Sequence, residues 1–349
     1  MPFCRNCGKQ SESGALFCES CEAAANSAAN NKSIDCELSF RGDSATLFKI
    51  WISNLLLTIC TLGIYYPWGR ANMKRYIYSS TYIGDYSFEF HGKGKQMFFG
   101  LLKFWGITFI FLVVWIAIIA LLVPDIDWLI EVVAWVLIIS YVPILGLFIH
   151  GARKFRLSRT SYRGIRFGYR GEKKPLILLM ILAVIPFAYP YFINKFRKYV
   201  YGNTRFGNVE AQFTGDDNAY AKIYWHSVFL CIVTLGIYYP WYKMRLFNFF
   251  WENLSFKKDG TIIEVVPKST AEGFFKLKAG NLLILIFTLG LGSPITKIRN
   301  MRFFADNLEL YGNIDLDTVI QTEEQYLNAL GDAATDMDDS ADFFDMDIF

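Results

Sequence analysis

Four cysteines near the N-terminus form the most specific chemical pattern in this chain. They make two Cys-x-x-Cys pairs separated by ten residues, namely Cys4, Cys7, Cys18 and Cys21. Four thiolates at this spacing can hold Zn²⁺ tetrahedrally, and a site with four protein ligands leaves no open position for catalysis. We therefore predict a structural zinc ribbon over residues 1–22, with Zn²⁺ as its cofactor.

Beyond the cysteines, the sequence contains no arrangement typical of an enzyme. It has only three histidines and shows no metalloprotease motif, dinucleotide-binding glycine pattern or nucleophile–base pair. The stretch Gly92-Lys93-Gly94-Lys95 lacks the spacing of a phosphate-binding loop. We predict that the protein is not an enzyme and assign no catalytic residue.

The composition indicates an integral membrane protein. Of the 349 residues, 53% are hydrophobic and 17% are aromatic, and the mean hydropathy is +0.26, which is too apolar for an ordinary soluble domain. The hydrophobic residues fall into six runs, at 46–68, 98–123, 128–149, 175–193, 219–241 and 279–295. The second and third runs are long and apolar enough to cross a bilayer as helices.

The elements that contain these runs repeat along the chain. The octapeptide Thr-Leu-Gly-Ile-Tyr-Tyr-Pro-Trp occurs at 61–68 and again at 234–241, and a weaker copy lies at 288–294. Each copy ends a hydrophobic run, and its proline predicts a kink or a stop. Short strand-like segments that end in Phe-x-Gly precede several runs, as at Phe40 and Phe213.

We therefore predict a polytopic α-helical membrane protein built from degenerate repeats over residues 34–316. Each repeat is expected to consist of a strand, a helix, a kink and an interfacial helix, and the short β segments are expected to lie on the cytoplasmic side. Residues 23–33 form a polar linker after the zinc ribbon, and residues 317–349 form an acidic, disordered tail.

The distribution of positive charge predicts the topology. Only the turn at Asp125 and Asp127 lacks Lys and Arg, so we place it outside the cell and both termini in the cytoplasm. Simple alternation of six spans would put some of the similar basic segments outside. Two interpretations remain: the proline-terminated runs re-enter the membrane from the cytoplasm, or all six runs span.

Four polar residues inside the runs are candidates for a shared role. Asn54, Ser227 and Asn281 each stand seven residues before the Thr of a Thr-Leu-Gly sequence, and His226 adjoins Ser227. They either hold helices together by hydrogen bonds or line a polar path.

The segments that follow the prolines alternate cations and rings. Such segments are typical of helices that contact anionic lipid head groups. The residues concerned are Arg70, Lys74, Arg75, Lys195, Arg197, Lys198, Lys243 and Arg245. We expect the lipid bilayer to be the partner of these segments and expect no nucleic acid, while the zinc ribbon or the acidic tail offers a contact for a cytoplasmic protein.

The Phe-x-Gly segments, the apolar runs and the doubled octapeptide together resemble the YjgN-like family of bacterial inner-membrane proteins, over roughly residues 34–316. The resemblance implies a multi-pass inner-membrane protein and supplies no substrate, since the family is uncharacterised. We predict a transporter or channel for a small solute or lipid. The alternative is a membrane scaffold or envelope-regulating protein that recruits a partner through its ribbon and tail.

Overall fold

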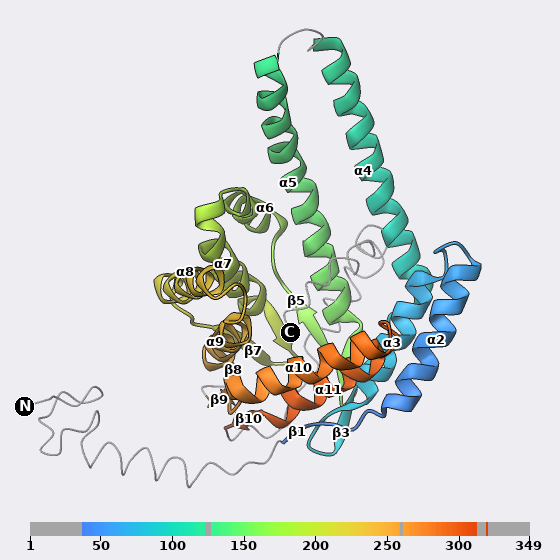
Figure 1. Ribbon diagram of the computed structural model, residues 1–349, viewed down its shortest axis with the longest axis vertical. Coiled ribbons are helices and arrows are strands. Elements are labelled where there is room, and N and C mark those ends of the chain that lie inside the picture. The colour runs from blue at the N-terminus through green and yellow to red at the C-terminus, as the bar shows by residue number, and fades with distance from the viewer. Residues whose placement is uncertain (1–36, 123–126, 259–260, 313–318, 320–349) are drawn as a thin grey trace, which may run out of the picture.

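The computed structural model describes residues 37–122, 127–258, 261–312 and 319 (Figure 1). The predicted zinc ribbon with its four cysteines, the linker and the acidic tail other than Val319 lie outside these residues.

Along the described chain, the order strand, helix, helix, strand occurs five times, and we number these stretches units one to five. Unit one is β1 (Leu38–Phe40), α2 (Ser44–Cys60), α3 (Tyr66–Ser79) and β2 (Thr81–Ile83). Unit two is β3 (Tyr86–Phe90), α4 (Gly94–Leu122), α5 (Asp127–Ser158) and β4 (Thr160–Tyr162). Unit three is β5 (Ile165–Tyr169), α6 (Lys173–Ile181), the short turns η1 (Leu182–Val184) and η2 (Pro186–Ala188), α7 (Tyr189–Gly202) and β6 (Thr204–Phe206). Unit four is β7 (Val209–Phe213), α8 (Asp217–Val233), α9 (Tyr239–Glu252) and β8 (Leu254–Lys258). Unit five is β9 (Thr261–Pro267), α10 (Ala271–Phe287), α11 (Ser293–Asp306) and β10 (Leu308–Tyr311).

The strands form one antiparallel sheet in chain order, from β1 to β10. A bridge between Glu37 and Glu309 brings the first strand beside the last, so the sheet closes into a ring. Successive units are joined by two-residue hairpins, in which Gly84, Gly164 and Gly207 supply the left-handed backbone that such tight turns need. The short β segments were predicted from the sequence, but their joining in one sheet was not.

The repeated Thr-Leu-Gly sequence reverses the chain. In unit one, Leu62 and Gly63 have φ of 51° and 92°, and the Thr61 hydroxyl accepts a hydrogen bond from the backbone N–H of Tyr65 at 3.0 Å. The corresponding residues Leu235, Gly236 and Leu289, Gly290 have nearly the same angles. Of the predicted kink or stop, the structure has the stop in these runs: the first helix ends, and Pro67 lies in the first turn of a second helix, where its missing N–H costs nothing.

The described chain contains two helices that are long and apolar enough to cross a membrane, within α4 and α5. A third candidate is the pair around α6 and α7, which is bent by 119°. In the other three units, the first and second helices form a hairpin whose two ends both join the sheet (Figure 1). Both ends of each of these hairpins therefore lie on the same side, at the sheet.

Each Phe-x-Gly sequence is explained by a close approach of ring and backbone. A Cβ atom on Gly42, Gly92 or Gly215 would lie 2.5–2.8 Å from the ring of the aromatic residue two positions earlier. The carbonyl of each glycine accepts a hydrogen bond from the second helix of the preceding unit; Arg75 Nη2, for example, lies 2.9 Å from the Gly92 oxygen. Arg302 of unit five reaches Gly42 of unit one in the same way, at 3.2 Å, so the ring of units is closed.

Buried apolar residues fill the interfaces between units. Phe40 and Leu47 of unit one pack with Ile298 and Ala305 of unit five, and Ala71 of unit one packs with Phe90 of unit two. The core is therefore a series of clusters around the ring.

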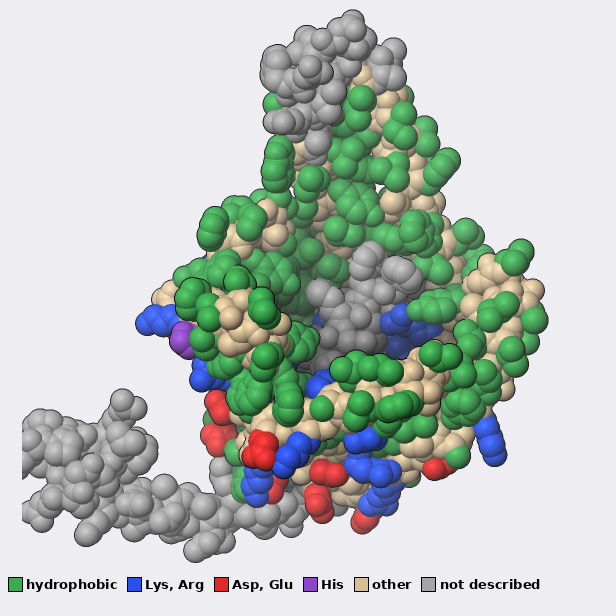
Figure 2. Space-filling model, in the orientation of Figure 1, with side chains coloured by type: hydrophobic (Ala, Val, Ile, Leu, Met, Phe, Trp, Pro, Cys, Tyr) green, Lys and Arg blue, Asp and Glu red, His purple; other side chains and the backbone are tan. Residues whose placement is uncertain are grey.

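The hairpin tips are apolar and exposed. Leu62, Leu235 and Leu289 are 92–94% exposed, although a left-handed backbone costs such residues about 1–2 kcal/mol. On the face shown in Figure 2, hydrophobic side chains cover the helices, and Asp and Glu gather at the edge formed by the strands. Each tip therefore presents an apolar side chain on a strained backbone.

Candidate functional site

The interior of the ring is basic. Figure 2 shows Lys and Arg side chains inside the central hollow, between the helix pairs. Several of these cations occupy the third or seventh position after a helix-starting proline, which places them on one face of the second helix. The residues at these positions are Arg70, Lys74, Arg197, Lys243 and Lys297.

One cavity, which we call the basic pocket, lies where units three, four and five meet. It has a volume of about 140 Å³ and is lined by Arg197 of α7, Lys243 of α9 and Lys278 of α10. The remaining lining residues are the aromatic or aliphatic side chains Tyr239, Met244, Leu246, Phe247, Phe250, Phe274 and Phe304. Among the residues that the structure describes, no Asp or Glu lines the pocket.

Aromatic rings hold the three cations in place. The Arg197 guanidinium lies 5.1 Å from the Phe250 ring, Lys243 Nζ lies 5.6 Å from the Tyr239 ring, and Lys278 Nζ lies 5.1 Å from the Phe274 ring. Burial, together with the charge of nearby Lys243, lowers the pKa of Lys278. A bound anion would relieve both effects.

Two further clefts open within the ring. One, of about 300 Å³, is lined by Arg70, Lys74 and Lys297 together with Asn54. The other, of about 280 Å³, lies beside β5 to β8 and contains Arg153 and Arg156. Cations therefore face the interior in every unit.

The structure places the predicted lipid-contact residues in three kinds of environment. Arg70, Lys74, Arg197 and Lys243 line interior cavities. Arg75 and Lys198 contact the next unit through Gly92 and Asp217. Lys195 and Arg245 are exposed. Among the predicted residues, Lys195 and Arg245 are therefore the best positioned for direct contact with lipid. This contact remains a prediction.

The aligned polar residues are buried within their own hairpins. Asn54 Nδ2 donates to the Gly69 carbonyl of α3 at 3.1 Å, and Asn281 Nδ2 donates to Asn300 Oδ1 of α11 at 2.9 Å. Ser227 is fully buried and His226 is exposed. Of the three clefts described above, only one contains any of these four residues, namely Asn54. The geometry therefore fits helix packing better than a shared polar path.

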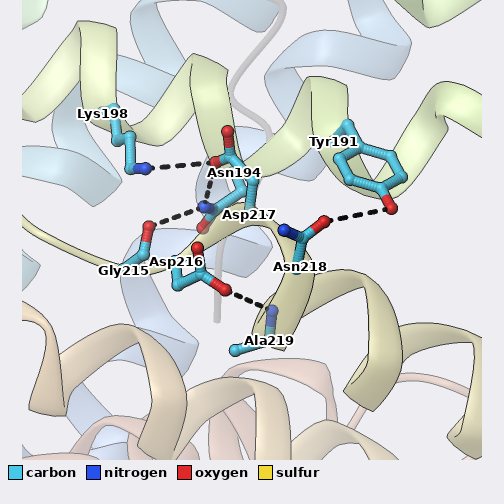
Figure 3. Close-up of polar contacts among 8 residues, drawn as sticks. All are labelled: Tyr191, Asn194, Lys198, Gly215, Asp216, Asp217, Asn218 and Ala219. Carbon is cyan, nitrogen blue, oxygen red and sulfur yellow. Dashed lines mark hydrogen bonds and ion pairs between the residues drawn. The ribbon is translucent and has the colours of Figure 1, made fainter.

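A polar cluster fixes α7 against unit four (Figure 3). Asn194, which is fully buried, donates through Nδ2 to the Gly215 carbonyl at 2.9 Å and to Asp217 Oδ1 at 2.6 Å. Lys198 Nζ lies 3.2 Å from the same carboxylate oxygen. This cluster sets the position of α7 and hence of Arg197, less than one turn from Asn194.

Replacing Asn194 by Leu should destabilise this junction by about 2–3 kcal/mol, because the Gly215 carbonyl and Asp217 lose a buried donor. Thermal unfolding of the detergent-purified protein would measure the loss. The exposed Asn218, whose contact with the Tyr191 hydroxyl is long at 3.5 Å, provides the control: Asn218→Ala should change stability by less than about 0.5 kcal/mol. Equal effects of the two variants would contradict this role for Asn194.

Sequence reasoning missed Lys278 and the sheet. Lys278 directly precedes an apolar run, and no motif marks it. The sheet did leave a signal, since Gly84-Asp85, Arg163-Gly164 and Gly207-Asn208 are two-residue turns between strand-forming segments.

Comparison with known proteins shows one family. The model of a family described as "Bacterial protein of unknown function (DUF898)" matches residues 35–213, 208–261 and 263–337. The chain is similar to "Inner membrane protein YjgN" of Escherichia coli O157:H7, with 25% identity over 221 residues, which cover 62% of this chain and 49% of that protein. It is also similar to the protein of the same name from Salmonella typhimurium strain LT2, with 26% identity over 157 residues, covering 42% and 37% of the two chains. The matched part is thus half or less of each relative's length, and no solved structure matches the chain.

Proposed function

The chain belongs to the DUF898 family of bacterial proteins of unknown function. We propose that it is an integral inner-membrane protein that transports, or forms a channel for, a small anionic solute or lipid. The names of its relatives support the inner-membrane location. The activity is inferred from the chain's own geometry.

In the membrane placement that we propose, two helices cross the bilayer and three helical hairpins enter it and return. Helices α4 and α5 have 29 and 32 residues, or about 43–48 Å, which exceeds the hydrocarbon core of about 30 Å. The hairpin helices α2, α8 and α10 have 17 residues each, or about 25 Å, and they enter the bilayer and return. The ring of strands and both termini then lie in the cytoplasm.

The five units are degenerate copies of one strand–helix–helix–strand module. Support comes from the doubled octapeptide and from the nearly identical left-handed backbone at Leu62, Leu235 and Leu289. Five copies around a ring enclose a central space, as internal repeats do in many transporters.

One observation carries the choice of an anionic ligand. In the basic pocket the cations face inward without a carboxylate among the lining residues, while the exposed hairpin tips are apolar. Positive charge that is partly shielded from water is stabilised when a counter-ion occupies the site. A negatively charged solute or lipid head group can supply that counter-ion.

Reconstitution of the full-length protein into liposomes tests the proposal. We expect faster translocation of a fluorescent anionic phospholipid, or faster efflux of an entrapped inorganic anion, than in protein-free liposomes. Arg70→Gln with Lys297→Gln should lower the rate by about tenfold, since two interior charges are lost. Lys276→Gln is the control, because Lys276 is exposed and pairs with Glu272 at 2.7 Å. Absence of both fluxes in correctly folded protein would refute transport.

A second function has its own support. Asn54 and Asn281 are bonded within their own hairpins, which supports a packing role for the aligned polar residues, and such a role fits a membrane scaffold. In that role the zinc ribbon, with Zn²⁺ held by Cys4, Cys7, Cys18 and Cys21, and the acidic tail would recruit a cytoplasmic protein. A folded protein that gives no flux but binds a cytoplasmic partner only when Zn²⁺ is present would favour this role.

A further inference from the structure

We propose that the basic pocket is a phosphate-binding site, in which Arg197, Lys243 and Lys278 clamp the phosphate of an anionic phospholipid head group or a free phosphate ion. This inference deepens the proposed function and rests on it for the membrane setting only. Its residues, size and position are argued below.

The three cations converge from separate parts of the chain. Arg197, Lys243 and Lys278 lie on α7, α9 and α10, which belong to three successive units. No ion pair with Asp or Glu involves these side chains within the described part of the structure, whereas neighbouring Lys198 and Lys276 each have a carboxylate partner. Convergence without neutralisation is the arrangement that an anion site requires.

Arg197 offers an unused donor. Its Nη1 atom is buried and has no hydrogen-bond partner among the described residues, although buried guanidinium nitrogens are normally satisfied. The guanidinium is held over the Tyr220 and Phe250 rings at 5.3 and 5.1 Å. A planar, fixed guanidinium with a free N–H is suited to phosphate oxygens, and the two lysines add charge from other directions.

The volume of the pocket fits a head group better than a whole ligand. A volume of about 140 Å³ is well below the roughly 300–1,000 Å³ of sites that enclose a whole drug-sized ligand. It suits a phosphate with its first bonded atoms. Phe274, Phe304 and Met244 on the walls provide apolar contact for the glycerol end of a lipid.

The position of Lys278 also fits a lipid. It lies in the first half of α10, just before the apolar stretch that ends at Phe287, which is 82% exposed. If the α10–α11 tip lies in hydrocarbon, Lys278 lies near the depth of the head groups, where a lysine can extend toward phosphate.

Native mass spectrometry of the detergent-purified full chain tests the site. The wild type should retain phosphatidylglycerol in preference to phosphatidylcholine. Lys243→Gln with Lys278→Gln should weaken phosphatidylglycerol binding by at least about tenfold, since two charged hydrogen bonds are lost. Lys276→Gln, on the same helix and already paired with Glu272, should bind as the wild type does.

Two results would overturn the proposal: unchanged binding by the double variant, or an equal loss in Lys276→Gln, which would indicate non-specific surface charge. If the double variant does not fold, Lys243→Gln alone decides, because Lys243 is exposed and its replacement should be tolerated. As a fold check, the double variant without lipid should unfold at the wild-type temperature or above it, because the repulsion between the lysines is removed.

Competition by inorganic phosphate distinguishes the two sources of the ligand. Displacement of phosphatidylglycerol by millimolar phosphate would assign the site to the phosphate group itself, and no displacement would assign it to lipid-borne phosphate. Binding that persists in a protein without flux would refute transport and leave the site intact. Flux in a protein whose double variant still binds normally would refute the site alone.

Discussion

Replacing Gly92 by Ala should disrupt the junction between units one and two and destabilise the protein by about 3 kcal/mol. The new Cβ would lie 2.5 Å from the ring of Phe90, which is only 5% exposed and packs against Met97 and Phe155. The ring therefore has no space to move into, and any shift of the backbone would break the bond from Arg75 to the Gly92 carbonyl. Thermal unfolding in detergent, followed by tryptophan fluorescence, would measure the loss.

Gly106→Ala is the matched control for this substitution. Gly106 lies within α4, and a Cβ atom there would meet nothing within 4 Å, so alanine should be neutral or slightly stabilising in the helix. The double variant Phe90→Leu, Gly92→Ala should recover part of the stability, because leucine removes the clashing end of the ring. A Gly92→Ala protein as stable as Gly106→Ala would show that the ring contact does not require glycine.

Substituting Asp for Leu62, Leu235 and Leu289 together should expel the hairpin tips from the bilayer. Each leucine is more than nine-tenths exposed, and a carboxylate in the hydrocarbon core costs about 2.5–3.5 kcal/mol on insertion scales. The long helices α4 and α5 would keep the protein in the membrane. We expect the backbone amides of the three tips to exchange hydrogen at least about tenfold faster in lipid nanodiscs, as measured by mass spectrometry.

Ile262→Asp provides the control for the tip leucines. Ile262 is also an exposed apolar residue, at 49%, but it lies on β9 in the sheet. Its replacement should leave exchange at the tips unchanged. Tips that already exchange at the rate of free peptide in the wild type would contradict their immersion.

The sequence identified the helical part of this fold better than the sheet. Long apolar runs are strong local signals, and they identified α4 and α5. The repeated Thr-Leu-Gly sequence with its following proline identified the sites where other runs end. The strands are mostly three to five residues long, as in β2 and β3, which is too short for alternation to be recognised. Ring closure between Glu37 and Glu309 depends on contacts across most of the chain.

Unit two was hard to recognise for a related reason. It lacks the octapeptide, and its helices have 29 and 32 residues, whereas the first helices of units one, four and five have 17. Its kinship with the other units is visible only in the strands on either side and in the Phe90–Gly92 junction.

The site was predictable only in part. Arg197 and Lys243 were selected from the sequence because they are cations that follow a proline. Both residues do lie on a helix that has that proline in its first turn. Their inward direction depends on how α7, α9 and α10 meet, and Lys278 enters the pocket from a helix with no comparable pattern. The family resemblance is confirmed by the matched family model and by the YjgN relatives.

Because β1 and β10 are neighbours, the first and last strands of the ring lie side by side, and a bridge joins Glu37 to Glu309. The two ends of the strand order therefore lie close together. Joining these ends and cutting the chain at another hairpin, such as the one at Gly207, would yield a circular permutant with the same arrangement of units and its loose ends at a different point of the circumference.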